Sequence, residues 1–309
     1  RVGVLAGSCH EYIELWHACL CGTAVINPLN NRLAAEEFVY ILNDSGTTVL
    51  FVDATYAPMI HEIRPRLAHL RTVVLIGSAD VPHDLSFDAI VDARPVTDLP
   101  PEPDDDQPAV LMYTGGTTGL PKGVVLTQRA IVLVTYRNNM GMLIQPGWRY
   151  LAFMPLFHVG SIMTWSLLIP TGGCVVLLPA FEPKAVMNAV REHRITAIAG
   201  VPTMFGLVVH HPDFEPSMFS TLQLMGYGAA PMPEALLKRL MEMYPNLDFF
   251  QAYGMTEFAA TVCALTPHDH RTGGAILRSV GQPCIGVEVE IRHPETRSEE
   301  HTSELQSRF

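Results

Sequence analysis

The sequence has 309 residues, is 48% hydrophobic, and carries 31 acidic against 20 basic side chains, for a net charge of -11. This length allows one large or two medium hydrophobic cores, and the lack of any Lys/Arg-rich run argues against a nucleic-acid partner or an anionic membrane surface. No apolar run reaches the roughly eighteen residues of a transmembrane helix, and no signal peptide is recognisable. The six cysteines form no CxxC pair, which is typical of reduced thiols. We therefore expect a cytoplasmic protein with reduced cysteines.

The first hundred residues alternate short apolar runs with amphipathic segments. Strands are predicted at 2–6, 24–28, 48–52 and 72–76, and helices at 10–21, 34–43 and 57–67. This alternation is typical of a doubly wound parallel sheet, so the fold class is α/β. Residues 96–108 contain four prolines and the triplet Asp104-Asp105-Asp106, which predict a solvated linker better than a metal site.

The same alternation resumes after the linker. Strands are predicted at 109–113, 124–126, 150–154, 174–178, 197–201, 222–225 and 248–251, and helices at 127–143, 160–168, 183–193, 203–210 and 234–244. Residues 280–291 alternate like the start of an antiparallel sheet or barrel. The predicted division is therefore a first α/β subdomain with its linker at 1–108, a second at 109–275, and the start of a β element at 276–296.

Both ends of the chain are unusual. The chain opens inside a strand-like run without an initiator methionine, so we expect a cut N-terminus. From Arg297 it reads RSEEHTSELQSRF, which is polar, lacks periodicity and resembles the translation of a common sequencing-library adapter. We expect residues 297–309 to be a non-native tail, and a disordered polar tail is the alternative.

The stretch YTGGTTGLPKG, residues 113–123, lies between two apolar runs. Because glycine has no Cβ and tolerates positive φ, such a loop can turn several backbone N–H groups towards one anion, above all phosphate. Its threonines add hydroxyl groups, and Lys122 adds a positive charge. It is not a Walker A loop, since Gly123 follows the lysine where that motif has Ser or Thr. A solvated hairpin is the alternative interpretation.

Two further motifs follow predicted strands, where open α/β sheets bind their ligands. In YGMTE, residues 253–257, the carboxylate of Glu257 could hold Mg²⁺ or cap a helix starting near Phe258. In GYGAAP, residues 226–231, small side chains leave room for a flat base, although for this motif by itself an ordinary strand-to-helix turn is the preferred interpretation.

Histidines give weaker signals. His158 follows a predicted strand in the pair Phe157-His158, but a lone histidine is more often a satisfied core residue than a catalyst. We expect His210, His211, His268 and His270 to lie in loops, and their spacing supports no metal site.

YTGGTTGLPKG resembles the phosphate loop of the adenylate-forming superfamily, which includes acyl-CoA synthetases, aryl-CoA ligases, luciferases and peptide-synthetase adenylation domains. Gly115 stands where serine is usual. The YGMTE, GYGAAP and Phe157-His158 segments resemble further motifs of the same family, and the resemblance covers nearly all of residues 1–295. It implies the large N-terminal domain, without the later Gly-Asp motif, the hinge and the small C-terminal domain whose lysine drives adenylation, so we expect this fragment not to complete the reaction alone.

The resemblance also implies the chemistry and its residues. A carboxylic acid would be activated with ATP and Mg²⁺ to acyl-AMP and then transferred to coenzyme A. The implied catalytic residues are Lys122, His158, Thr256 and Glu257. The implied Mg²⁺ ligands are Thr117 and Glu257. The implied nucleotide-binding residues are Thr114, Gly115, Gly116, Thr117, Thr118, Gly119, Lys122, Gly228, Ala229, Ala230, Gln251, Ala252, Tyr253, Gly254 and Thr256.

The acid pocket is expected at His158, Val201, Phe205, Gly226 and Tyr227. These residues offer no cation for a second carboxylate and no acid for an amine, so a medium- or long-chain fatty acid is the first choice and an aryl acid the second. Acyl transfer to a carrier protein and nucleotide binding without turnover stay open. The expected partners are the acid and coenzyme A, with a homodimer as an option.

Overall fold

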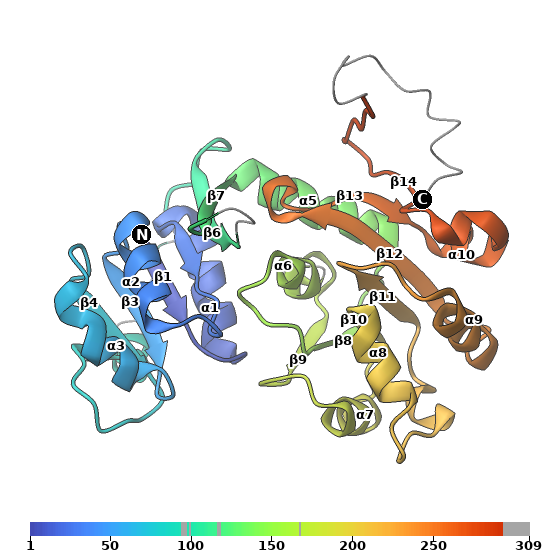
Figure 1. Cartoon of the computed structure of the whole chain (residues 1–309), viewed down its shortest axis with the longest axis horizontal. Helices are drawn as coiled ribbons and strands as arrows, with labels where there is room; N and C mark the ends of the chain where they lie inside the picture. Colours follow the sequence, from blue (N-terminus) through green and yellow to red (C-terminus); the bar gives the residue numbers. More distant parts are fainter. Residues whose placement is uncertain (94–97, 99, 116–118, 167, 293–309) are drawn as a thin grey trace. The chain divides into compact units, whose positions relative to one another are not determined.

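The computed structural model describes residues 1–93, 98, 100–115, 119–166 and 168–292. The chain divides into two compact units (Figure 1). The first contains Arg1–Val132 and Pro155–Ser161, and the second contains Leu133–Met154 and the described residues from Ile162 onward. Each unit is built around one sheet.

Within the described residues, the sheet of the first unit has seven strands in the order β5-β4-β3-β1-β2-β6-β7. The strands are Val2–Leu5 (β1), Ile26–Pro28 (β2), Val49–Asp53 (β3), Thr72–Ile76 (β4), Leu85–Ser86 (β5), Pro108–Thr114 (β6) and Lys122–Thr127 (β7). All neighbours pair in parallel except β6 and β7, which form an antiparallel hairpin. The sheet extends beyond the boundary predicted at Pro108 because this hairpin joins its edge.

Helices cover both faces of this sheet. Helices α2 (Ala35–Asp44) and α3 (Ala57–Ile63) pack on one face, in a core that includes Phe38, Ile60 and Leu50. Figure 1 shows α1 (His10–Ala18) on the opposite side, where Phe87 of α4 (Phe87–Ala93) also meets Phe51 with ring centroids 6.2 Å apart. This is the doubly wound arrangement that the sequence predicts.

The described sheet of the second unit also has seven strands, in the order β14-β13-β12-β11-β10-β8-β9. They are Arg149–Ala152 (β8), Cys174–Leu177 (β9), Ala197–Gly200 (β10), Leu224–Gly228 (β11), Asp248–Met255 (β12), Ala260–Leu265 (β13) and Gln282–Pro283 (β14). Strands β8 to β12 are parallel, whereas β13 and β14 are antiparallel to their neighbours. The β element expected from residue 280 is therefore present, but as one short strand.

One face of the second sheet is covered by three helices, as Figure 1 shows. They are α7 (Pro183–Glu192), α8 (Pro202–Val209) and α9 (Glu234–Met243). The other face packs against the end of α5 (Gln128–Met142) and against Trp148 and Leu168. The remaining helices are α6 (Val159–Ser166) and α10 (Pro267–Thr272). Strand β13 and helix α10 were missed by the sequence prediction.

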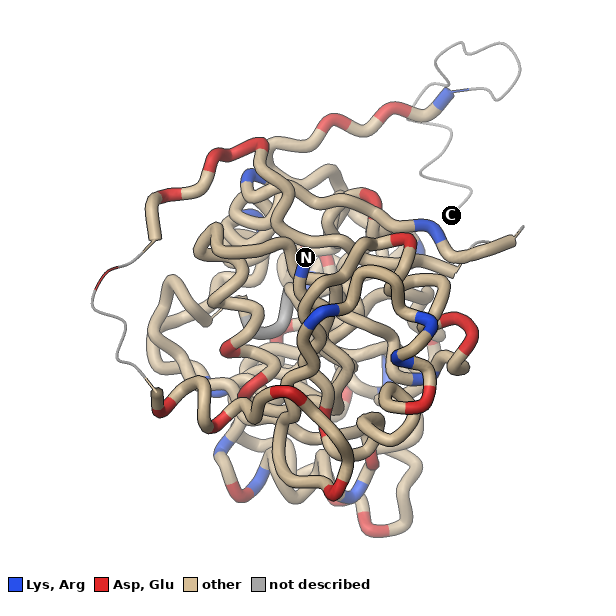
Figure 2. Tube along the Cα trace, turned by 90° about the vertical axis from the view of Figure 1, so that its left-hand side faces the viewer, with Lys and Arg blue, Asp and Glu red and all other residues tan. Residues whose placement is uncertain are grey.

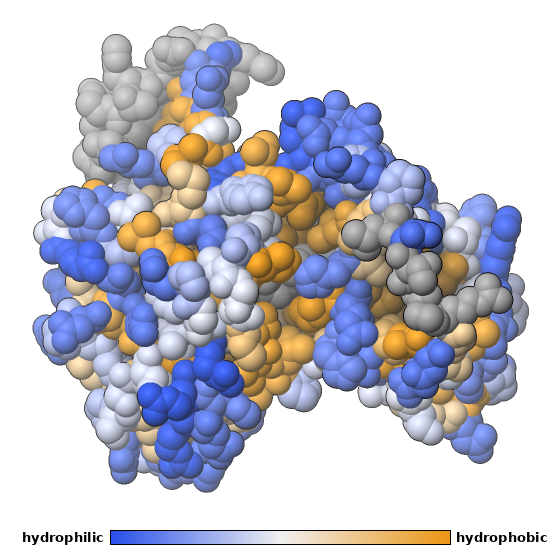
Figure 3. All heavy atoms as spheres, turned by 180° about the vertical axis from the view of Figure 1, so that it is seen from behind, coloured by the Kyte–Doolittle hydropathy of each residue, from blue (hydrophilic) through white to orange (hydrophobic). Residues whose placement is uncertain are grey.

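Charge and apolar side chains are distributed as the composition suggests. In the view of Figure 2, Lys and Arg occur singly or in short groups along the tube, among more numerous acidic residues. Apolar side chains reach the surface in several places in Figure 3. No helix in the described part of the chain is long and apolar enough to cross a membrane.

All six cysteines are free thiols, but Cys21 and Cys174 are exposed, so burial of the cysteines is only partly confirmed.

Candidate functional site

The glycine- and threonine-rich loop joins the two strands of the β6–β7 hairpin, with Thr114 opposite Lys122. A Cβ atom placed on Gly115 or Gly119 would meet no other atom within 4 Å. The space beside these glycines is open, and the packing of the described residues does not require glycine there. Open backbone of this kind lets a ligand approach the N–H groups closely. The predicted nucleotide-binding residues Gly116, Thr117 and Thr118 lie outside the described residues.

The loop end of this hairpin is bound to α2 through Tyr113, which pairs with Gly123. Its hydroxyl donates a hydrogen bond to Oδ2 of Asp44 at 2.5 Å, and burial followed by this hydrogen bond raises the pKa of Tyr113. The ring lies over Gly123, where an added Cβ would be 3.2 Å from Tyr113 Cζ and 2.9 Å from Leu111 Cδ1. A Cβ at Gly123 would therefore require the ends of the Leu111 and Tyr113 side chains to shift.

The side chain of Lys122 is exposed at the start of β7. Among the described residues its ammonium group has no ion-pair partner. An unpaired cation beside a Gly/Thr loop is suited to neutralise a phosphate.

His158 lies immediately before helix α6, in the first unit. Its backbone N–H donates to the Pro155 carbonyl at 3.1 Å, and its carbonyl accepts from the Ser161 hydroxyl at 2.6 Å. The side chain is solvent-exposed at one edge, yet burial by the surrounding chain, and next the charge of Arg32, lower the pKa of the imidazole. A neutral ring can donate or accept a hydrogen bond without carrying charge.

The sequence predicts that the YGMTE segment follows the end of a strand. In the structure its first three residues, Tyr253 to Met255, are part of the strand, because β12 continues through Met255. Pairing with β13 extends it, with a bulge between Tyr253 and Gly254. A Cβ on Gly254 would lie 1.5 Å from the carbonyl oxygen of Ala260, so only glycine fits this position. The close approach of the two backbones explains why this motif carries a glycine at its centre.

The last residues of the motif form a single 3₁₀ turn, Thr256–Phe258, rather than a longer helix. Glu257 is exposed on this turn, and no salt bridge or hydrogen bond engages its carboxylate among the described residues. Tyr253 is 49% exposed, so one face of its ring is available to a planar ligand. Gln251 is buried, and Ala252 is half-buried.

The first three residues of GYGAAP belong to β11, and the turn itself begins at Gly228, the last residue of that strand. A Cβ on Gly228 would lie 2.6 Å from the Ala252 carbonyl oxygen, and Ala229 adopts a left-handed φ of 64°. Ala229 and Ala230 are exposed. The turn therefore presents backbone and two methyl groups to solvent, a flat surface of the kind that can lie against a base.

The expected acid-pocket residues do not share one face. Successive residues of a strand point to opposite sides, and Tyr227 belongs to the core beneath α7, α8 and α9, whereas Gly226 faces Ala199 on the other side. Tyr227 and Phe205 are 2% and 3% exposed. Their side chains are core residues, while Val201 is half-buried before α8.

The prediction that His270 lies in a loop is wrong, and so is the same prediction for His268. Both belong to α10, and His270 is 1% exposed. Its Nε2 lies 2.8 Å from the Tyr227 hydroxyl. The sequence signal that could have found it is Thr266-Pro-His-Asp269, a capping box with proline at the first helical position.

The residues present fit Mg²⁺ of the kind held mainly by phosphates. Within the described chain, no group of three His, Cys, Asp or Glu side chains converges into a protein-only metal site. Mg²⁺ commonly uses one or two carboxylates together with substrate phosphates and water. The single free carboxylate of Glu257 suits that mode.

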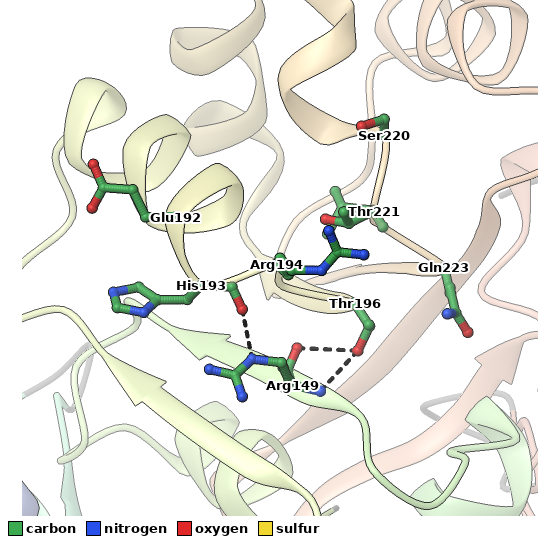
Figure 4. Close-up of a pocket in the computed structure, with 9 residues that line it drawn as sticks. Arg149, Glu192, His193, Arg194, Thr196, Ser220, Thr221 and Gln223 are labelled. Carbon is green, nitrogen blue, oxygen red and sulfur yellow. Dashed lines mark hydrogen bonds between the residues drawn. The ribbon is translucent and has the colours of Figure 1, made fainter.

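A polar hollow lies at the amino ends of β8, β10 and β11, at the opposite sheet edge (Figure 4). Arg149 and Arg194 line it, and Nε of Arg149 donates to the His193 carbonyl at 2.5 Å. That carbonyl follows the last turn of α7, so these arginines complement the negative end of the helix. We therefore assign this hollow to the packing of α7 and not to a ligand site.

Comparisons with known proteins identify the family of this chain. The family model described as AMP-binding enzyme matches residues 1–304. The chain is 32% identical over 304 residues to a fatty acid–[acyl-carrier-protein] ligase, ScoC, of Streptomyces coeruleorubidus, and 34% identical over 302 residues to a feruloyl-CoA synthase of Amycolatopsis sp.. These alignments cover 96% and 95% of this chain but 56% of each relative.

Solved structures show the same architecture. The inhibitor-bound N-terminal domain of FACL13 from Mycobacterium tuberculosis matches with a TM-score of 0.82 and 27% identity, over 97% of this chain and 73% of that chain. The anthranilate CoA ligase AuaEII in complex with anthranoyl-AMP matches with a TM-score of 0.88 and 25% identity, over 96% of this chain and 57% of that chain.

The chain belongs to the AMP-binding enzyme family. It spans a little over half the length of the curated relatives that it matches.

Proposed function

We propose that this chain is the adenylating part of an acid–thiol ligase, which activates a carboxylic acid with ATP and then forms a thioester with coenzyme A. The observation that carries the proposal is the exposed Thr256–Glu257 turn, whose carboxylate has no partner among the described residues and whose position is fixed by the β12–β13 pairing. Exposed carboxylates are common on surfaces, and Glu257 is distinguished by its place after a stretch of β12 whose contact with Ala260 admits only glycine at position 254.

The proposed reaction joins two anions. A carboxylate oxygen attacks the α-phosphorus of ATP, the bond to pyrophosphate breaks, and an acyl-adenylate forms. A thiol then attacks the acyl carbon, and AMP leaves with the bonding electron pair. Because the reactants repel each other, catalysis depends on positioning and on neutralising charge.

Groups suited to this task are present among the motif residues. In the first unit, Lys122 and the loop amides would bind phosphate oxygens, and neutral His158 would contact the acid or the nucleotide. No general base is required, because the acid is already ionised at neutral pH. In the second unit, Thr256 would bind the α-phosphate, Tyr253 and the Gly228–Ala230 turn would hold the base, and Glu257 would hold Mg²⁺. When bound, Mg²⁺ would neutralise phosphate charge.

A medium- or long-chain fatty acid remains the first proposed substrate. Its support is the relative described as a fatty acid–[acyl-carrier-protein] ligase and the half-buried apolar side chain of Val201, which precedes α8. An aryl acid is the second candidate, and the feruloyl-CoA synthase at 34% identity favours it. A carrier-protein acceptor is a further option, because ScoC is described as a ligase to an acyl-carrier protein. The six free thiols support a cytoplasmic location.

Acid-dependent ATP–pyrophosphate exchange tests the proposal. The full-length gene product should exchange label between pyrophosphate and ATP with a C8–C16 fatty acid, and less with ferulate or benzoate. The 309-residue chain should bind ATP but form no acyl-CoA. Binding of ATP by the full-length protein without exchange for any acid would instead support a nucleotide-binding role without turnover.

A further inference from the structure

A buried hydrogen bond joins Tyr227 to His270 in the second unit. The Tyr227 hydroxyl lies 2.8 Å from Nε2 of His270, and the two residues are 2% and 1% exposed. The rings meet edge to face, with centroids 5.6 Å apart at 84°, and Phe249 packs on the imidazole with centroids 6.0 Å apart. The pair is thus held by packing as well as by the hydrogen bond.

The direction of this hydrogen bond follows from the second nitrogen of the ring. Nδ1 of His270 lies 2.8 Å from the carbonyl oxygen of Thr266, and a carbonyl can only accept. Nδ1 therefore carries the proton, Nε2 of the neutral ring is an acceptor, and the Tyr227 hydroxyl donates to it. Every polar atom of the pair is satisfied without a net charge, which suits its burial.

The bond spans the strand that carries the YGMTE segment. Tyr227 in β11 lies opposite Gln251 in β12, and Gln251 lies opposite Leu265 at the end of β13. His270 follows β13 on α10, whose start is fixed by the Thr266–Asp269 capping box. The hydrogen bond therefore connects β11 to the element beyond β13, with β12 between them.

Both ends of this connection adjoin the candidate nucleotide-binding segments. Tyr227 immediately precedes the Gly228–Ala230 turn. Strand β13, which leads into α10, pairs with Tyr253 and Gly254 of the YGMTE segment. A change in the Tyr227–His270 distance would therefore alter how the turn and the YGMTE strand lie relative to one another.

We propose that His270 is a positioning residue: through its hydrogen bond to Tyr227, it holds the Gly228–Ala230 turn in register with the Tyr253–Glu257 segment, so that one nucleotide can contact both. The proposal rests on the proposed function and adds to it a residue that touches neither nucleotide nor acid.

The test uses three variants of the full-length enzyme: Tyr227→Phe, His270→Leu and the double variant. Each single variant leaves a buried polar atom without its partner, whereas the double variant removes both, so it should recover part of the lost thermal stability. The positioning role predicts that the KM for ATP in the exchange assay stays raised, about five- to twentyfold, in all three, with a smaller change in kcat. A non-additive effect is expected because the two residues act as one unit.

Matched controls separate this role from simple destabilisation. His210→Leu removes a histidine with the same local bond, from Nδ1 to the Gly206 carbonyl at 2.7 Å, and Tyr244→Phe removes a hydroxyl bonded to the Pro216 carbonyl at 3.1 Å. Both should leave the KM for ATP within twofold of the parent. A KM that recovers with stability in the double variant, or that follows the melting temperature across all five variants, would overturn the proposal.

Amide hydrogen exchange gives a readout that does not depend on activity. Peptides covering residues 228–231 and 253–257 should exchange faster in Tyr227→Phe than in the parent, and unchanged protection of both would also overturn the positioning role. If the parent binds no ATP at all, the proposed function fails, while the exchange rates still decide whether the pair holds the two segments.

Discussion

Replacing Gly254 by alanine should damage the candidate site more than the fold. The added Cβ would lie 1.5 Å from the Ala260 carbonyl oxygen, about half of an ordinary contact distance, so β12 and β13 must separate there. The two register pairs beyond the bulge, Gly254 with Thr261 and Met255 with Ala260, would be lost. At about 1 kcal/mol for each hydrogen bond, the cost is about 2 kcal/mol.

The assays are urea unfolding and acid-dependent pyrophosphate exchange. Because the separated segment leads into the Thr256–Glu257 turn, kcat/KM for ATP should fall at least about a hundredfold, which exceeds what about 2 kcal/mol of lost global stability explains in a folded protein. Gly206→Ala is the matched control, since its Cβ would lie 3.8 Å from Leu236 in an ordinary contact and should be neutral or stabilising. Parental activity and parental unfolding in Gly254→Ala would refute this reasoning.

Three further predictions follow from the same contacts. Lys122→Ala should lower kcat about 10²- to 10³-fold in the exchange assay, yet leave the free energy of unfolding within about 0.5 kcal/mol, because the side chain is exposed and unpaired among the described residues; a large loss of stability would show a structural role instead. Glu257→Gln should raise the Mg²⁺ concentration needed for half-maximal exchange at least tenfold, and an unchanged Mg²⁺ titration would exclude Glu257 as a ligand. Burial, the largest influence, lowers the pKa of His270 below its unfolded value near 6.5, so the unfolded chain binds the proton first as the pH falls. The contribution of the neutral ring to stability is therefore full above about pH 6.5 and is lost as the pH falls towards the folded pKa. In His270→Leu, the melting temperature should depend less on pH between pH 7 and pH 5 than it does in the parent.

The sequence alone predicts the α/β class and most strands, because buried parallel strands are short apolar runs separated by amphipathic helices. The helix predicted from residue 127 begins at Gln128, where the Thr127 hydroxyl accepts from Ala130 N–H at 3.3 Å. The sequence does not predict the length of β12, since Tyr253-Gly-Met has no apolar pattern and depends on pairing with β13. Register with a distant segment cannot be deduced from local composition.

In the candidate site, too, the sequence identifies motifs but does not predict contacts between distant segments. The motif residues are recognisable because they resemble motifs of the adenylate-forming superfamily. The expected pocket residues Gly226 and Tyr227 are adjacent in sequence, but the alternation of β11 places their side chains on opposite faces of the sheet. His270 was missed because its partner lies 43 positions away.

The central claim is that a carboxylate oxygen attacks the α-phosphorus of ATP, and an isotope experiment tests it most directly. The full-length enzyme is given a fatty acid with both carboxylate oxygens labelled with ¹⁸O, together with ATP, Mg²⁺ and coenzyme A, and the AMP is analysed by mass spectrometry. Adenylation predicts one ¹⁸O in the phosphate of AMP and none in pyrophosphate. AMP without label, or label recovered in orthophosphate, would contradict the claim, because the acid would then have been activated by a different bond.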